Sequence, residues 1–104
     1  MKRVQAVIKP ERLDSVQHKL AEAGFVGIMV HDVRGHGSEA EPTGEYRGVR
    51  FAMTVKHKLL IDLLVEDDEV ERVVSIIRDE AKTPGPGDGL VFVLDCAAVF
   101  PIGD

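Results

Sequence analysis

Two apolar strand–helix–strand patterns, separated by a polar stretch, constrain how this chain can fold. The first pattern spans residues 4–33 and the second spans residues 59–94. Each has short apolar runs on either side of a segment with apolar residues at helical spacing. The stretch between them, 34–58, contains a proline, four glycines and few large apolar side chains before Phe51. Such a stretch buries too little apolar surface to offset the loss of conformational entropy on ordering. We therefore expect an exposed loop at about 36–56 that carries the function of the protein.

The first pattern predicts a strand, a helix and a second strand. Val4, Ala6 and Ile8 alternate with polar residues, and Val7 gives this strand a second apolar face, so we expect it to be central. Pro10 suits the first turn of the following helix, and Gly24 suits its C-cap. The helix has an apolar stripe that consists of Leu13, Val16, Leu20 and Ala23. The second strand is expected over residues 25–33.

The second pattern repeats this order. A buried strand is expected over 59–65, and residues 51–55 are expected to extend it backwards as a long hairpin with the strand over 25–33. A helix then begins at Asp67 or Asp68, with Asp68 and Glu71 spaced as in a capping box. Its buried stripe consists of Val70, Val73, Val74 and Ile77, and it ends before Pro84. A glycine-rich turn over 85–89 leads to a strand over 90–94, and the tail over 97–104 is an edge strand or an irregular arm.

The order of these elements predicts an α+β, ferredoxin-like βαβ-βαβ sandwich. Its four-stranded antiparallel sheet carries both helices on one face. The other face is left bare, although the strands carry apolar residues on both faces. We therefore expect further copies of the chain to cover the bare face in a closed oligomer.

Composition narrows the class of protein. The length of 104 residues suits one domain, 1–104, with one core. The net charge of −5 argues against nucleic acid as a partner. No apolar run approaches the roughly 20 residues that span a bilayer, so no direct membrane insertion is expected. The single cysteine, Cys96, excludes an internal disulfide framework, and we expect a cytoplasmic protein without a signal peptide.

Several motifs, in order and across nearly the whole chain, resemble the PII nitrogen-regulatory signal-transduction family. The segment 6–10, Ala-Val-Ile-Lys-Pro, resembles the family's first strand and helix start. The segment 33–37, Val-Arg-Gly-His-Gly, resembles the glycine pair that opens the family's exposed T-loop. Thr43 and the Tyr-Arg-Gly run 46–48 match the T-loop motif. Further matches are 67–71 at the second helix, and Thr83, Gly-Asp-Gly 87–89 and 91–92 in the C-terminal signature.

This resemblance implies a homotrimer with a nucleotide cleft at each subunit boundary. It implies a regulator that senses ATP, ADP and 2-oxoglutarate and docks its T-loop onto a transporter or a metabolic enzyme. The ligand-binding positions it implies are Gly35, Gly37, Ser38, Glu39, Lys58, Leu64, Gly87, Asp88, Gly89 and Met29. The docking positions are Glu41, Thr43, Glu45, Tyr46, Arg47, Arg50 and Phe51.

The loop differs from the family pattern at the positions where the family is covalently modified and where it binds 2-oxoglutarate. The family's modified tyrosine is Phe51 here, and phenylalanine has no hydroxyl to be uridylylated; Tyr46 is the remaining, less suitable acceptor. Ser38 and Glu39 stand where the family has arginine and glutamine. That glutamine helps to hold the magnesium that binds 2-oxoglutarate, whereas Glu39 would repel the dicarboxylate. Without the glutamine, Lys58 either pairs with 2-oxoglutarate as in the family or pairs with Asp62 or Glu39.

The positions that contact the nucleotide in the family also lack several of the family's residues. Leu90 stands in place of a basic residue, Met29 in place of a threonine that bonds the adenine, and the tail lacks the two phosphate-binding arginines. Each charge-assisted contact to phosphate contributes on the order of 1.5–3 kcal/mol. Losing three or four of them lowers ATP affinity by several orders of magnitude, at about 1.4 kcal/mol per decade. We expect a weakly bound adenine nucleotide (ADP, AMP or ATP), another small anion, or a vestigial site.

Two alternative functions stay open. His31, His36 and His57 flank the stems of the loop, so a metal-responsive binding protein on the same trimeric fold is one alternative. None of these pairs has a recognised ligand spacing, so exposed histidines at a loop base are the favoured interpretation. A ligand-independent interaction module is the other alternative. Catalysis is not expected, because no nucleophile and base have a recognisable spacing.

Overall fold

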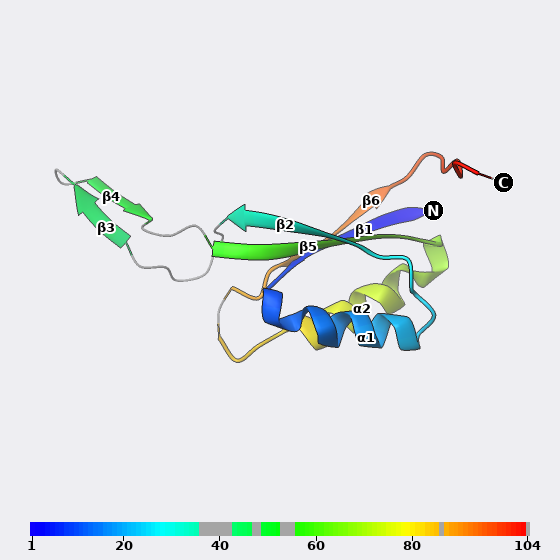
Figure 1. Cartoon of the computed structure of the whole chain (residues 1–104), viewed down its shortest axis with the longest axis horizontal. Helices are drawn as coiled ribbons and strands as arrows, with labels where there is room; N and C mark the ends of the chain where they lie inside the picture. The colour runs from blue at the N-terminus through cyan, green and yellow to red at the C-terminus, as the bar shows by residue number, and fades with distance from the viewer. Residues whose placement is uncertain (36–42, 47–48, 53–55, 86, 104) are drawn as a thin grey trace.

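Four antiparallel strands form one sheet, and both helices lie on one of its faces (Figure 1). The computed structural model describes residues 1–35, 43–46, 49–52, 56–85 and 87–103, without the side chains of 43–52. The sheet has the order β2-β5-β1-β6 and consists of β1 (Lys2–Ile8), β2 (Met29–Gly35), β5 (Lys56–Val65) and β6 (Leu90–Asp95). The helices are α1 (Leu13–Glu22) and α2 (Val70–Ala81), each preceded by a short 3-10 turn, η1 (Pro10–Arg12) and η2 (Asp67–Glu69). The predicted ferredoxin-like class and the central position of β1 are confirmed.

The first helix forms as its sequence predicts, but the strand after it begins later. Gly24 has a φ of 96°, which favours glycine at the end of a helix. The amide of Phe25 donates a hydrogen bond to the carbonyl of Leu20 at 2.8 Å. Because the backbone at Phe25 closes the helix, the predicted strand start at residue 25 is wrong, and β2 begins at Met29.

The predicted capping box at the second helix is also wrong. The N-cap of α2 is Glu69, and no side chain among the described residues forms a capping hydrogen bond with this helix. The acidic residues before it form η2, closed by a bond from the Glu69 amide to the Glu66 carbonyl at 2.9 Å. The Asp67 carboxylate accepts a hydrogen bond from the N-terminal amine of Met1 at 2.7 Å. It therefore ties the helix start to β1.

The helix-facing side of the sheet carries the core. In β1, the fully buried residues are Val4, Ala6 and Ile8, as the alternation predicts. The two helices contribute the predicted stripes, of which Val16, Leu20, Val73 and Ile77 are fully buried. The remaining core residues are Leu59, Ile61, Leu63, Val65 and Ala81. Burial of this apolar surface is what holds the helices against the sheet.

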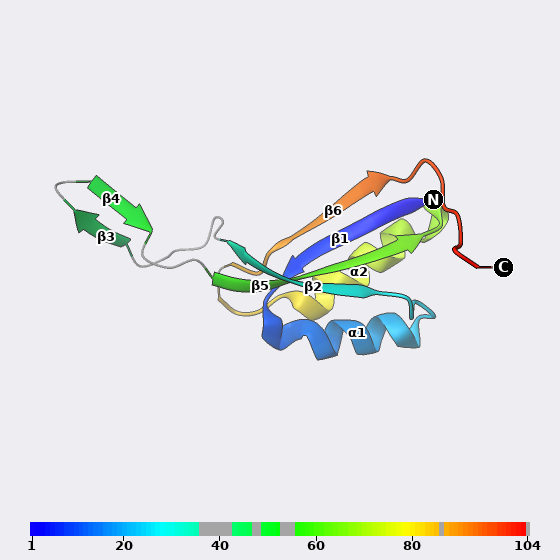
Figure 2. The ribbon, with the colours of Figure 1, turned by 45° about the horizontal axis from the view of Figure 1, so that its top comes forward.

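On the opposite face of the sheet, the part of the chain that the structure describes places no helix (Figure 2). Strand pairing places the alternate residues of each strand there, among them Met29, Leu64, Phe92 and Leu94, which are all more than 40% exposed. We refer to this surface as the bare face. Residues 97–103 form no strand, so of the two predictions for the tail the irregular arm is correct. None of the described helices is long and apolar enough to cross a membrane.

Candidate functional site

The segment after α2 folds back against the end of β1 and is fixed by one threonine. The Thr83 amide donates to Oδ2 of Asp88 at 3.0 Å, and its hydroxyl donates to Oδ1 at 2.6 Å. The Lys9 ammonium donates to the Thr83 hydroxyl at 2.8 Å and lies 3.4 Å from Asp88. The bonds from Thr83, helped by Lys9, hold the pKa of Asp88 below its ordinary value. The carboxylate of Asp88, a predicted ligand residue, thus forms hydrogen bonds that hold its own loop in place.

Gly89 is the tightest position in this loop. Its φ is 109°, and a Cβ built there would lie 1.7 Å from the carbonyl oxygen of Val7. Gly87 also has a positive φ, 81°. These two glycines therefore have a geometric reason to be present, independent of any ligand. The contact with Val7 fixes where the loop meets β1 and enters β6.

Lys58 connects β5 to the same loop. Its side chain is buried, and the ammonium donates a hydrogen bond to the carbonyl of Gly87 at 2.8 Å. Gly35, at the end of β2, pairs with Lys56, two residues before Lys58. Gly35, Lys58 and 87–89 therefore gather at one end of the sheet. Two ammonium groups, of Lys9 and Lys58, contact the loop against the single carboxylate of Asp88, so the charge of these three groups is net positive and favours an anion over a cation.

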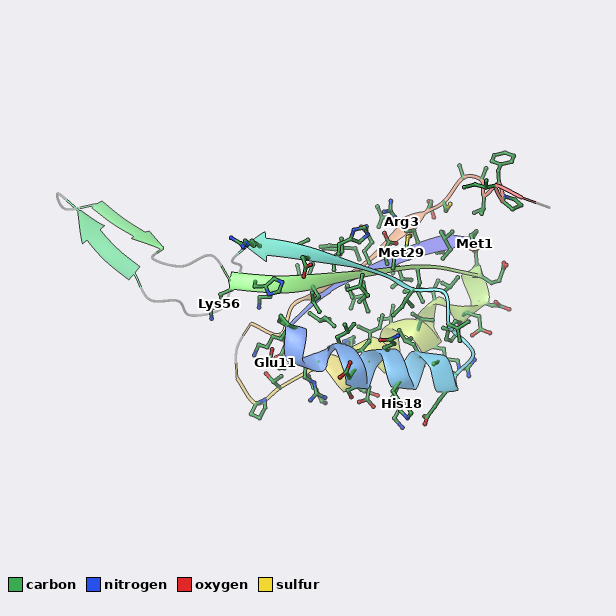
Figure 3. All side chains as sticks on the ribbon, viewed as in Figure 1. Met1, Arg3, Glu11, His18, Met29 and Lys56 are labelled. Atoms are coloured by element: carbon green, nitrogen blue, oxygen red, sulfur yellow. The ribbon has the colours of Figure 1, made fainter. Side chains whose placement is uncertain are left out.

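Two other predicted ligand residues lie at the opposite end of the bare face. Met29 pairs with Asp62, and Leu64 lies two residues further along β5; both side chains are about half exposed. Leu64 lies six residue steps along β5 from Lys58, which is roughly 20 Å at about 3.3 Å per step. Figure 3 shows Met29 near Arg3, with Lys56 far along the sheet towards the hairpin. The structure thus divides the predicted site into two groups, while Gly37, Ser38 and Glu39 lie outside the described residues.

A buried carboxylate on the bare face is a feature that sequence reasoning did not identify. Asp62 is 1% exposed although no helix covers it. Arg3 donates from Nε to both carboxylate oxygens at 3.1 Å and from Nη2 to Oδ2 at 2.7 Å, and Gln5 donates at 3.2 Å. The bond from Arg3 is the main reason that the pKa of Asp62 is lowered. A charged residue inside the apolar run 59–65 is the sequence signal that would have predicted such a partner.

The two described histidines near the loop, His31 and His57, do not lie together. His31 and His57 lie on opposite faces, because His31 pairs with Leu60 while His57 pairs with Arg34. His57 Nε2 lies 2.9 Å from Oδ1 of Asp32, and both side chains are largely exposed. Among the described residues, no three histidine, cysteine or acidic side chains come together as a metal site. His36 lies outside those residues.

The predicted docking positions that the structure describes fall on a separate hairpin. Beyond Gly35 and Lys56 the chain leaves the main sheet, and β3 (Thr43–Tyr46) pairs antiparallel with β4 (Val49–Ala52). Figure 1 shows this hairpin lying away from the helices, past the ends of β2 and β5. Phe51 pairs with Gly44, so the prediction that 51–55 would pair with β2 is wrong for this residue. Thr43, Glu45, Tyr46, Arg50 and Phe51 lie on the hairpin, whereas Glu41 and Arg47 lie outside the described residues.

Comparison with known proteins is consistent with this arrangement. The family model described as "Nitrogen regulatory protein P-II" matches residues 1–102. The chain is 40% identical over 102 residues to nitrogen regulatory protein P-II 1 of Escherichia coli strain K12, covering 98% of this chain and 91% of that protein. It is 41% identical over 93 residues to nitrogen regulatory protein P-II of Microchaete diplosiphon, covering 89% of this chain and 83% of that protein.

The contact between Gly89 and Val7 gives a first prediction. Gly89→Ala is expected to lower the free energy of unfolding by at least about 1–2 kcal/mol, because the backbone is left-handed there and the new methyl group overlaps a carbonyl. Gly85→Ala is the control, since its nearest atom would be the Lys9 ammonium at 3.9 Å. Urea unfolding at a fixed chain concentration measures both. Equal effects of the two substitutions would contradict the proposed close contact.

The Arg3–Asp62 pair gives a second prediction. Arg3→Ala leaves the buried Asp62 carboxylate with the hydrogen bond from Gln5, so we expect the free energy of unfolding to fall by about 1–3 kcal/mol at neutral pH. Because the folded pKa of Asp62 lies below its unfolded value, the pair stabilises the fold above the unfolded pKa. That contribution is lost as the pH falls through the folded pKa.

The difference in the free energy of unfolding between the wild-type chain and Arg3→Ala should therefore shrink below about pH 4. Unfolding curves recorded between about pH 3 and 7 test this. Lys19→Ala, an exposed cation on α1, is the control. A difference that stays constant over this range would show that the arginine acts by packing and not by its charge.

Proposed function

Since the chain belongs to the nitrogen regulatory protein P-II family, whose members are signal-transducing regulators, we propose that it acts by docking an exposed loop onto a target protein. The observation that carries this proposal is the separate hairpin. The ladder between β2 and β5 ends at the pair of Gly35 and Lys56, and the chain then makes its own two-stranded sheet beyond the body. Exposed loops on a rigid scaffold are the usual carriers of recognition. The target is a transporter or a metabolic enzyme.

The proposal includes assembly of three copies through the bare face. This face carries a row of exposed apolar side chains, including Leu64, Phe92 and Leu94, around the Arg3–Asp62 pair. Exposed apolar patches of this kind are typical of interfaces. The two halves of the predicted ligand site lie at opposite ends of this face, which supports a cleft completed by a neighbouring copy. The trimer is what membership of the family leads us to expect.

We also propose that ligand control is weak or altered in this chain. Asp88 is committed to Thr83 and Lys9, and Lys58 bonds the carbonyl of Gly87. Leu90, at the position next to Gly89, is 64% exposed and offers no charge to a phosphate. The loop therefore docks with less dependence on ATP and 2-oxoglutarate than the family pattern implies. A metal-dependent function has no comparable support among the described residues.

Replacement of the hairpin tests the docking proposal. In one variant, a flexible glycine–serine linker replaces residues 43–52. This variant should keep its fold but should no longer be crosslinked to partner proteins in its host cell. Chemical crosslinking with mass spectrometry identifies those partners. His18→Ala, an exposed change on α1, is the control and should retain them. Recovery of the same partners from the linker variant would contradict docking through the hairpin.

Calorimetric titration tests the weakened nucleotide site. We expect the wild-type chain to bind ATP no tighter than about the millimolar range, since three or four phosphate contacts are missing. Leu90→Lys is expected to raise the affinity by about tenfold, because it restores one charge-assisted contact. Leu90→Gln removes the same apolar side chain without adding charge and should give little gain. Micromolar binding by the wild-type chain would refute the prediction.

A further inference from the structure

A histidine lies among the apolar side chains of the bare face. Strand register puts the exposed His31 opposite Leu60, two residues along β2 from the pair of Met29 and Asp62. Residues at such diagonal positions of an antiparallel pair lie about 7–8 Å apart, so His31 is a neighbour of the buried Asp62. The pKa of Asp62 is lowered mainly by the hydrogen bond from Arg3, and the charge of His31 lowers it further. The bare face therefore holds a titratable group beside its ion pair.

The charged groups that face His31 from the neighbouring strands are mostly cations. On β5, Lys58 pairs with Val33 and so is diagonal to His31 on the side away from Asp62. On β1, Arg3 donates hydrogen bonds to both oxygens of Asp62 at 2.7 and 3.1 Å. The negative charge of Asp62 is thus already balanced by Arg3. A proton on His31 would meet a neutralised carboxylate on one side and an ammonium group on the other.

The other described strand residues add no carboxylate to this face. Asp32 and Arg34 flank His31 in β2, and because side chains alternate along a strand, both lie on the helix side. Strand β6 contributes apolar side chains to the bare face, which are Leu90, Phe92 and Leu94. Asp62 is therefore the only carboxylate that the described strands place there. Protonation of His31 would raise the positive charge of a face on which cations already outnumber carboxylates.

Assembly through the bare face would take His31 out of water. Met29, Leu64 and Phe92 are 58%, 45% and 42% exposed on this face, and a neighbouring copy would cover them together with the histidine. Burial of a charged imidazolium is costly unless a carboxylate pairs with it, whereas the neutral imidazole is tolerated. Because the copies are identical, a neighbour's bare face brings the same excess of positive charge. The assembled state therefore favours the neutral form of His31.

We propose that protonation of His31 separates the copies that the bare face brings together. This inference rests on the assembly in the proposed function and adds its regulation by pH. The assembled state binds fewer protons than the separate chains, so assembly is favoured where imidazole is neutral and is lost as the pH falls. Histidine side chains change charge between about pH 5 and 8. A fall in pH within this range would also separate the hairpins that assembly holds together.

Sedimentation at a series of chain concentrations, at about pH 7.5 and about pH 5.5, tests this switch. We expect the dissociation constant of the wild-type assembly to be at least about tenfold higher at the lower pH. In His31→Asn, which is polar but cannot be protonated, this pH effect should disappear. His57→Asn, the matched control on the helix side, should keep it. Circular dichroism at both pH values checks that each chain stays folded.

A second variant keeps the test decisive where asparagine itself disturbs the contact. His31→Lys carries its charge at both pH values, so at about pH 7.5 it should dissociate as the wild-type chain does at about pH 5.5. A wild-type constant that does not change with pH would overturn the switch and leave the assembly standing. A full pH effect in His31→Asn, or wild-type affinity of His31→Lys at the higher pH, would do the same. A wild-type chain that is monomeric at both pH values would overturn the assembly and the switch together.

Discussion

The pairing of β1 with both of its neighbours is the constraint on which the rest of the structure depends. Its register puts Val4, Ala6 and Ile8 under the helices and Arg3 and Gln5 on the bare face. Because side chains alternate across a strand, a slip by one residue would exchange the two sets and bury the charges under the helices. The Arg3–Asp62 pair and the core are thus two results of one register. The same strand supplies the Val7 carbonyl that fixes Gly89.

The two ends of this sheet have different roles. At one end the ladder of β2 and β5 stops, the hairpin of β3 and β4 begins, and the loop with Gly87 and Gly89 is fixed against β1. At the other end the N-terminal amine is held by Asp67, and the arm leaves β6. A helix-covered body therefore carries the hairpin of β3 and β4 at one end and the apolar arm at the other. The docking that we propose would use this combination of a stable scaffold and an exposed segment.

The departures from the family pattern leave the fold intact because they lie at surfaces. Leu90 and Met29 are both more than half exposed, so exchanging a polar residue for an apolar one at these positions does not change the packing of the core. Such changes affect what a ligand or a neighbouring copy would contact. If the proposed site and assembly hold, exposed apolar side chains at these positions would contact a neighbouring copy without giving charge to a ligand.

The sequence by itself determined the order of the elements, the core stripes and the fold class. Periods of two and of about 3.6 residues are local properties, so Val4 to Ile8 and the stripes of both helices could be assigned without knowing any neighbour. Only the tertiary structure decided the boundaries that depend on a partner. Phe25 belongs to the end of the first helix and not to β2, because its amide bonds the carbonyl of Leu20. Phe51 pairs with Gly44 and not with β2.

The chemistry of the candidate site depended on the tertiary structure for the same reason. The partners of Asp62 lie 57 and 59 residues away in the chain, and those of Asp88 include Lys9. Strand register brings such residues together, and register is set by the packing of the whole sheet. The sequence thus identified which residues line the ends of the strands. The fold decided which of them meet, and it separated Met29 and Leu64 from Gly35 and Lys58 along the length of β5.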